Sequence, residues 1–311
     1  MQLNYILGLD IGSVSVKLAL IQDGKTQSKV YLRNTGLIPT IKQGLRLLPE
    51  VNITGVGVTG SGASFVKALV GGDYMDSEII AHVAATQKEY PEVRTVLDIG
   101  GEDSKLMLIK GGILSGFQMN KDCGGGTGSM IETIAARLGV KIEDVGKVAL
   151  ESKNPANLPG KCGIFAQSAA VSELSKGRPV RDILMGVCRA LVGNYLGVLA
   201  KGKKLLKPIV FQGATALNPA LVKCFEDELG SPILVPEDCS YMGAIGIAEL
   251  TRENMNGQPT RFRGVENIIN ADYKTEISYC EDCENHCELL SLYMDGELVG
   301  RSGSRCEKNN L

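Results

Sequence analysis

The sequence predicts an α/β protein built from two similar domains, and two observations carry that prediction. Residues 10–21 (DIGSVSVKLALI) and 98–109 (DIGGEDSKLMLI) repeat each other, sharing the Asp, Ile, Gly, Lys, both Leu and the final Ile. Strand-like and helix-like apolar patterns also alternate along most of the chain, as they do in α/β folds. With 311 residues, the chain is long enough for two domains that each have a core.

Each copy of the repeat is typical of a β-hairpin with Asp and Gly at its turn. An apolar strand (YILGL or RTVL) precedes each Asp, and a second strand (VKLALI or SKLMLI) follows the turn. Two such hairpins predict two similar domains that face each other. Packing alone does not explain an acidic residue at the same place in both turns, so these turns are candidates for function.

The other elements are predicted from periodicity and from Gly and Pro positions. Strands are expected at 111–120, 208–213 and 232–236, a strand–turn–helix unit at 55–69, and helices at 77–90, 126–140, 180–205, 219–229 and 240–252. The first domain is expected at 1–92 with a returning helix at 240–253, and the second at 93–239. A linker at 254–270 and a small Cys-rich tail at 271–311 complete the chain.

Composition predicts a soluble, cytoplasmic protein. Hydrophobic residues make up 44% and charged residues 22%, and the net charge of −2 gives no general attraction to nucleic acid or anionic membranes. The N-terminus has no signal-peptide pattern, and no apolar run reaches about 18 residues. We therefore expect neither a nucleic acid nor a membrane as partner.

The two turns offer what a nucleotide's phosphates and its cation require. Glycines let backbone N–H groups approach phosphate, and carboxylates hold Mg²⁺ directly or through water. The first turn supplies Asp10, Gly12 and Ser13, and the second supplies Gly100, Gly101 and three acids, Asp98, Glu102 and Asp103. No P-loop motif is present, and the glycines at 124–128 do not fit a Rossmann fingerprint.

Nine cysteines without a secretory signal favour metal binding or catalysis over disulfides. Cys188 and Cys224 lie in apolar helical patterns and are expected in the core. Cys123 and Cys162 each stand just before a helix start and are followed by glycine, where helix N–H groups favour a thiolate or an anionic cluster. Two ligands per chain are half of what a [4Fe–4S] cluster takes, and a two-fold dimer would supply the others.

The tail has a second group of cysteines with metal-ligand spacing. Cys280, Cys283, Cys287 and Cys306 suit either zinc or an iron–sulfur cluster, with His286 as an alternative ligand. The spacing does not choose between these metals. His82, the other histidine, lies in a helical pattern and is assigned no chemistry.

A family resemblance rests on four of these segments. In order and spacing, DIGSVSVK, DIGGEDSK, VFQGATALNP and MGAIGIAEL resemble the phosphate-1, phosphate-2, adenosine and connecting motifs of the actin, sugar-kinase and Hsp70 ATPases. Within that superfamily the chain resembles the BadF/BadG/BcrA/BcrD group over about residues 5–252. These proteins activate 2-hydroxyacyl-CoA dehydratases and ATP-dependent benzoyl-CoA reductases.

The resemblance implies two duplicated actin-like (ribonuclease H-like) ATPase domains with ATP or ADP and Mg²⁺ in the cleft between them. Asp10, Asp98, Glu102 and Asp103 are then the expected catalytic carboxylates, and Glu102 replaces the Gln of many relatives. The implied nucleotide-binding residues are Gly12, Ser13, Lys17, Gly100, Gly101, Lys105, Gly213, Ala214 and Gly243.

The resemblance also implies that Cys123 and Cys162 of two subunits hold one [4Fe–4S] cluster in an oxygen-sensitive homodimer. ATP hydrolysis would then drive an electron, received from a ferredoxin or flavodoxin, into an iron–sulfur partner enzyme. The tail resembles the Cys-rich region that follows such ATPase modules in larger, fused relatives.

Two other functions fit the same fold. A sugar or small-acid kinase would need a phosphate acceptor and a catalytic Asp, and it leaves Cys123 and Cys162 unexplained. A nucleotide-dependent sensor or scaffold would lack catalysis. A brown colour after anaerobic purification, bleached by dithionite, separates the electron-transferring activator from both.

Overall fold

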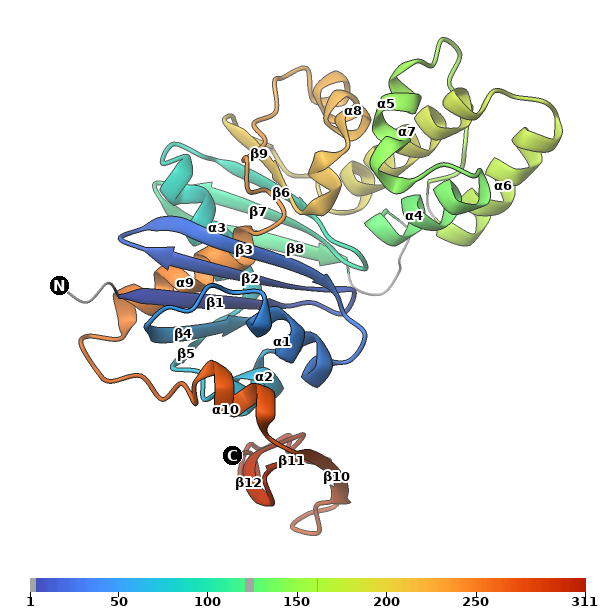
Figure 1. The fold of residues 1–311 in the computed structure, drawn as a ribbon. Coiled ribbons are helices and arrows are strands. Elements are labelled where there is room, and N and C mark those ends of the chain that lie inside the picture. The colour runs from blue at the N-terminus through green and yellow to red at the C-terminus, as the bar shows by residue number, and fades with distance from the viewer. Residues whose placement is uncertain (1–3, 121–125, 161) are drawn as a thin grey trace. The chain divides into compact units, whose positions relative to one another are not determined.

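The computed structural model describes residues 4–120, 126–160 and 162–311, and the chain divides into two compact units. Unit 1 comprises 1–85 and 243–311, and unit 2 comprises 86–242. Sheets and helices together confirm the α/β class (Figure 1). No helix in the described ranges is long and apolar enough to cross a membrane.

Unit 1 contains a five-stranded sheet of order β3-β2-β1-β4-β5. Its strands are β1 Tyr5–Ile11, β2 Ser15–Gln22, β3 Lys25–Arg33, β4 Ile53–Thr59 and β5 Tyr74–Met75. Its helices are α1 Leu37–Arg46, α2 Ala63–Val70, most of α3 Glu78–Glu89, nearly all of α9 Met242–Asn254, and α10 Val265–Asn270. Buried Leu, Ile and Val of β1, β2 and β4 form its core with residues of α1 and α2.

Unit 2 contains a four-stranded sheet of order β8-β7-β6-β9. Its strands are β6 Thr95–Ile99, β7 Ser104–Lys110, β8 Ile113–Asn120 and β9 Ile209–Gln212. Its helices are α4 Gly128–Arg137, α5 Val145–Leu150, α6 Gly163–Ser175, α7 Val180–Val198 and α8 Pro219–Leu229, with 3-10 turns η1 Ile142–Asp144 and η2 Ala214–Leu217. The buried face of α7 lies at the centre of the core.

The two sheets confirm the predicted duplication. In each, three antiparallel strands are followed by a parallel one, and the repeated segments are the hairpins β1–β2 and β6–β7. The registers are equivalent, because Asp10 pairs with Lys17 and Asp98 pairs with Lys105. The repeat in the sequence is therefore a repeat of tertiary structure.

Two expectations need correction, and one segment with regular structure was not predicted. Residues 232–236 form no strand, and only Leu234 bridges to β9, because Pro232 and Pro236 leave too few backbone donors for a ladder. The long helix ends at Val198 instead of near 205, before Gly202 at a φ of 71°. The segment 25–46 holds β3 and α1, which the periodicity did not predict.

The region after 271, predicted as a small Cys-rich tail, is folded and belongs to unit 1. It forms an antiparallel sheet of β10 Tyr273–Tyr279, β11 Glu288–Met294 and β12 Glu297–Ser302. Leu292 joins the core of unit 1, and a Cβ on Gly300 would lie 2.4 Å from the Cβ of Ala68 in α2. Residues 254–270 include α10, and Arg261 N–H donates to Asp73 Oδ1 at 2.7 Å.

Candidate functional site

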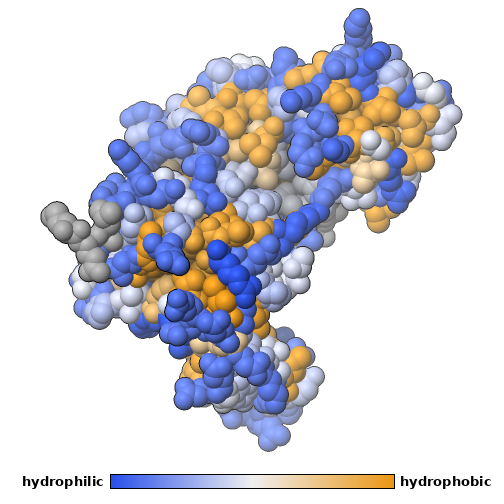
Figure 2. All heavy atoms as spheres, viewed as in Figure 1, coloured by the Kyte–Doolittle hydropathy of each residue, from blue (hydrophilic) through white to orange (hydrophobic). Residues whose placement is uncertain are grey.

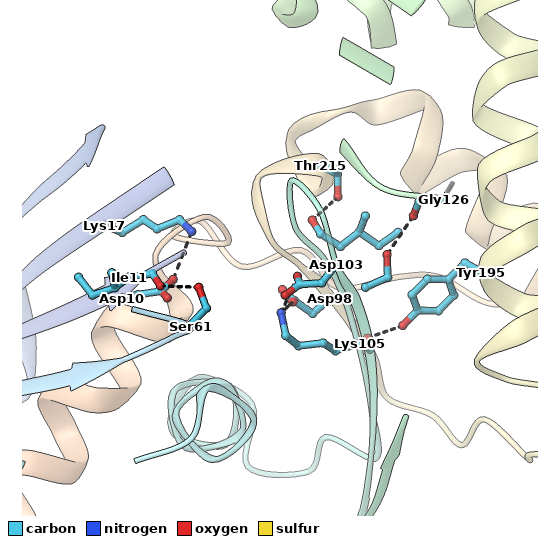
Figure 3. A network of polar contacts seen from close by, with 12 residues as sticks. Asp10, Ile11, Lys17, Ser61, Asp98, Asp103, Lys105, Gly126, Tyr195 and Thr215 are labelled. Carbon is cyan, nitrogen blue, oxygen red and sulfur yellow. Dashed lines mark hydrogen bonds and ion pairs between the residues drawn. The ribbon is translucent and has the colours of Figure 1, made fainter. Parts of the chain in front are cut away.

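The first turn holds an ion pair at the end of its hairpin. Lys17 Nζ lies 3.3 Å from Asp10 Oδ2, and both side chains are largely buried (Figure 3). The turn is closed by a hydrogen bond from Gly12 N–H to the Ser15 carbonyl, at 3.0 Å. Ser13 at its tip is exposed. A carboxylate and backbone groups therefore meet here, as Mg²⁺ and phosphate binding require.

A glycine of the neighbouring strand end lies directly against this turn. Gly60 has a φ of 92°, and a Cβ there would be 2.6 Å from the Ile11 carbonyl oxygen. Ser61 Oγ donates to the same carbonyl at 3.2 Å. The segment 55–69 is predicted from the sequence as a strand, a Gly-rich turn and a helix, and none of its residues is among the predicted site residues.

Helix α9 begins beside Asp10. A Cβ on Gly243 would lie 2.9 Å from Asp10 Oδ2 and 3.3 Å from His82 Nε2. Asp10 and the buried His82 therefore both lie next to this Cβ position. Asp10 Oδ2 and His82 Nε2 are at most about 6.2 Å apart, which is the sum of the two distances. His82, which carried no predicted role, belongs to the immediate surroundings of Asp10; its lone position on a helical face gave no signal of this.

The second turn holds a more deeply buried version of the same pair. Lys105 Nζ lies 3.4 Å from Asp98 Oδ2 and 2.7 Å from Asp103 Oδ1, and Asp98 and Lys105 are 2% and 3% exposed (Figure 3). Burial raises the pKa of Tyr195, whose phenol donates to the Lys105 carbonyl at 2.6 Å. Glu102 is exposed at the turn tip.

Gly213 is the counterpart of Gly60. Its φ is 88°, and a Cβ there would lie 2.4 Å from the Ile99 carbonyl oxygen and 3.0 Å from Asp98 Oδ1. Thr215 Oγ1 donates to that carbonyl at 2.8 Å, as Ser61 does in unit 1. Ala214 follows at the half-buried start of η2. The structure thus brings Gly213 and Ala214 to the second turn.

The first amides of helix α4 bind the second turn. Gly128 N–H donates to the Gly100 carbonyl and Ser129 N–H to the Gly101 carbonyl, both at 2.9 Å. Ser104 Oγ adds a bond to the Gly126 carbonyl at 2.9 Å. Since α4 also packs against α6, the turn and these two helices form one connected assembly within unit 2.

The cysteines divide by environment. Cys162 is the half-buried N-cap of the 13-residue helix α6, as predicted, whereas Cys123 lies outside the described residues. Burial raises the pKa of Cys188 and, to about 11, that of Cys224, which matches their expected place in the core. Burial also raises the pKa of Cys239.

The tail cysteines lie in and beside the β10–β11 hairpin. Cys280 and Cys287 are buried, and Cys283 and Cys306 are exposed. Across the described ranges, no three His, Cys, Asp or Glu side chains are gathered closely enough to hold a metal ion.

Comparison with known proteins defines the class. Residues 7–251 match the BadF/BadG/BcrA/BcrD ATPase family, and the chain belongs to this family. Both turns, both Asp–Lys pairs and Cys162 lie inside the matched range, and the four tail cysteines lie outside it.

Individual members of the family and their solved structures resemble this chain over most of its length. The (R)-2-hydroxyglutaryl-CoA dehydratase activating ATPase of Acidaminococcus fermentans is 30% identical over 254 residues, 78% of this chain and 95% of that protein. The crystal structure of that organism's dehydratase component A superposes with a TM-score of 0.74, covering 80% of this chain and 98% of that one, at 30% identity. The Clostridium difficile activator of 2-hydroxyisocaproyl-CoA dehydratase with bound ADPNP also gives 0.74, at 27% identity, covering 80% of this chain and 94% of that one. These matches confirm an activator-type, actin-like fold.

Proposed function

We propose that this protein is an ATP-dependent activator that passes a low-potential electron to an iron–sulfur enzyme. Its family membership and the names of its relatives support this proposal. The client is an enzyme of the 2-hydroxyacyl-CoA dehydratase or benzoyl-CoA reductase type, and a ferredoxin or flavodoxin supplies the electron.

ATP and Mg²⁺ bind at the two turns in this proposal. Asp10 and Asp98 hold the cation directly or through water, while Lys17 and Lys105 balance their charge. Gly12, Ser13, Gly100 and Gly101 bring backbone amides to the phosphates, and Gly213 and Ala214 face the adenosine. The nucleotide cleft between the domains stays a prediction.

A [4Fe–4S] cluster is held by Cys123 and Cys162 of two copies of the chain. Cys162 fits such a group, because its thiol stands at the positive end of a 13-residue helix and makes no capping hydrogen bond to the first amides itself. When bound, the cluster supplies one-electron redox chemistry. Ile164 and Phe165, the next apolar residues, are 72% and 68% exposed, as a contact with a second copy requires.

Hydrophobic residues also reach the surface over the helical part of unit 2 (Figure 2). Exposed apolar surface beside Cys162, which two chains would share as a cluster ligand, is expected to become buried in a dimer.

The observation that carries the proposal is the pair of bonds from α4 to the second turn. In this proposal, a shift of Gly100 and Gly101 on nucleotide binding acts on Gly128 and Ser129 through these two 2.9 Å bonds. Helix α4 then moves against α6, whose N-cap is Cys162. The two positions of α4 relative to α6 then bind nucleotide with different affinities. This difference is the free energy that couples nucleotide binding to the surroundings of Cys162.

Two variants of the anaerobically purified protein test the proposal. Cys162→Ala is expected to lose nearly all bound iron and sulfide, because one ligand from each subunit is missing. Asp10→Asn is expected to lose ATP turnover, measured without any sugar acceptor, and to keep its iron. Cys306→Ser serves as the cysteine control and keeps both properties.

Iron content unchanged in Cys162→Ala contradicts the shared cluster, and full turnover in Asp10→Asn contradicts the role of that carboxylate. Electron paramagnetic resonance of the reduced protein, recorded with and without ATP, reports whether nucleotide changes the cluster environment.

A further inference from the structure

A buried polar pair that the proposed function does not use lies beside the second turn. The Thr86 hydroxyl of α3 donates to Gln212 Oε1 at 2.8 Å, and both residues are 0% exposed. Gln212 is the last residue of β9 and directly precedes Gly213. Thr86, Gln212 and the second turn all belong to unit 2.

The register of the sheet places Gln212 beside Asp98. The two residues are partners in the parallel pairing of β6 with β9. Register partners on neighbouring strands, about 4.8 Å apart, project to the same face of a sheet. The opposite face carries Leu97 and Phe211, which belong to the core of unit 2. Because Lys105 of β7 is the other register partner of Asp98, an ammonium group and an amide flank this carboxylate.

The two carboxylate oxygens of Asp98 differ in their surroundings. Oδ2 lies 3.4 Å from Lys105 Nζ, which is closer still to Asp103 Oδ1, at 2.7 Å (Figure 3). Oδ1 lies on the β9 side, because a Cβ on Gly213 would be 3.0 Å from it. A carboxylate that is 2% exposed needs more than one shared lysine to offset its loss of hydration.

The Gln212 amide is suited to supply the additional contact. Its Oε1 accepts the Thr86 hydroxyl, and since the amide is planar, this bond also fixes the direction of Nε2. Nε2 carries two N–H donors, and buried donors require acceptors, among which a carboxylate is one of the strongest.

We infer that Gln212 is a positioning residue for Asp98. Its amide N–H groups donate to the carboxylate and hold it in one orientation, and Thr86 keeps the amide in place. This inference rests on the proposed binding of ATP and Mg²⁺ at the two turns, where Asp98 meets the cation directly or through water.

The equivalent position in unit 1 is chemically different. Thr59 of β4 is the register partner of Asp10 and is also 0% exposed. Its hydroxyl has a single hydrogen, which it donates to the Asp76 carbonyl at 2.8 Å. Thr59 therefore has no hydrogen left for Asp10, and support of the carboxylate from the neighbouring strand is specific to the second turn.

Binding of Mn²⁺ to the full-length chain in complex with ADP tests this inference, with the electron paramagnetic resonance signal of free Mn²⁺ as the readout. Gln212→Met keeps the length of the side chain and removes its N–H donors. It is expected to weaken Mn²⁺ binding by about 10-fold to 100-fold, since residues that orient a metal ligand contribute on that scale. The affinity for ADP without the metal, measured by calorimetry, should stay unchanged.

Thr86→Val tests whether Thr86 acts through the amide. Valine has nearly the shape of threonine and lacks the hydroxyl, so the amide loses its fixed orientation. A smaller loss of Mn²⁺ affinity is expected, and the double variant should bind Mn²⁺ no more weakly than Gln212→Met alone. Wild-type Mn²⁺ affinity in Thr86→Val overturns the inference even if Gln212→Met fails to fold.

Thr59→Val is the matched control. It also removes a buried hydroxyl hydrogen bond beside the Asp of a turn, so it should lower the free energy of unfolding in urea and leave Mn²⁺ affinity unchanged. Equal Mn²⁺ affinities of the wild type and Gln212→Met overturn the inference alone, as does an equal loss of ADP affinity without the metal. Wild-type protein that binds no Mn²⁺ with ADP overturns the proposed nucleotide site as well.

Discussion

The acidic residues of the second turn differ in their freedom to act on water. Lys105 contacts both Asp98 and Asp103, so the Asp103 carboxylate is neutralised by a buried ammonium group 2.7 Å away. Glu102, one residue earlier, is exposed at the tip of the turn. Of the two acids open to the hydrolytic role, we therefore favour Glu102.

Replacing each acid by alanine separates their roles. Glu102→Ala is expected to lower kcat for ATP hydrolysis by about 100-fold, with little change in KM, because an oriented base contributes on that scale. Asp103→Ala is expected to lower kcat by less than about tenfold and to reduce the free energy of unfolding, since the buried Lys105 loses a partner. Steady-state kinetics and urea denaturation measure both effects. A larger kcat loss in Asp103→Ala refutes the assignment.

At the scale of elements, glycines let α9 lie against the sheet of unit 1 and against α3. A Cβ on Gly8 of β1 would lie 1.9 Å from the Ala244 carbonyl, and one on Gly246 of α9 would lie 1.8 Å from the Ala81 carbonyl. These contacts are with backbone, which has little freedom to shift. They set the position of Gly243, in the first turn of α9, beside Asp10.

Gly246→Ala is expected to lower the free energy of unfolding by about 3 kcal/mol, the upper end of the overpacking range. Gly197→Ala in α7 is the matched helical control, because a Cβ there meets nothing within 4 Å. That change should be neutral or stabilise by up to about 1 kcal/mol, through the higher helix propensity of alanine. Thermal unfolding compares the two variants, and equal stabilities contradict this packing argument.

At the scale of the whole molecule, the proposed activator is complete only as a pair of chains. One chain offers two cysteines to the cluster, and apolar Ile164 and Phe165 are exposed beside one of them. The cluster and the dimer should therefore depend on each other, as any ligand shared by two subunits requires.

Removal of iron by an anaerobic ferrous chelator is expected to convert the dimer into monomers of about half the mass. Light scattering at low micromolar concentration measures this change, and rebuilding the cluster should restore the dimer. The same chelator already saturated with ferrous iron is the control and should leave the mass unchanged. A dimer that persists without iron shows that the interface does not need the cluster.

Much of this protein could be predicted from the chain alone. The repeat placed Asp10 and Asp98 at equivalent turns, and the register of each hairpin then paired each with a lysine seven positions later. Local patterns also predicted Cys162 before a helix start and placed Cys188 and Cys224 in the core. These features follow from spacing within one hairpin or helix, so neighbouring residues encode them.

Contacts between distant segments were decided only by the tertiary structure. The approach of Gly60 to Ile11, the place of His82 beside Asp10, and the bonds from α4 to Gly100 and Gly101 each join separate elements. The same holds for the tail, where Asn309 reaches Cys280 across a folded sheet. The sequence by itself determined which residues can perform the chemistry, whereas packing of sheets and helices decided which of them meet, because burial and backbone hydrogen bonding depend on the whole fold.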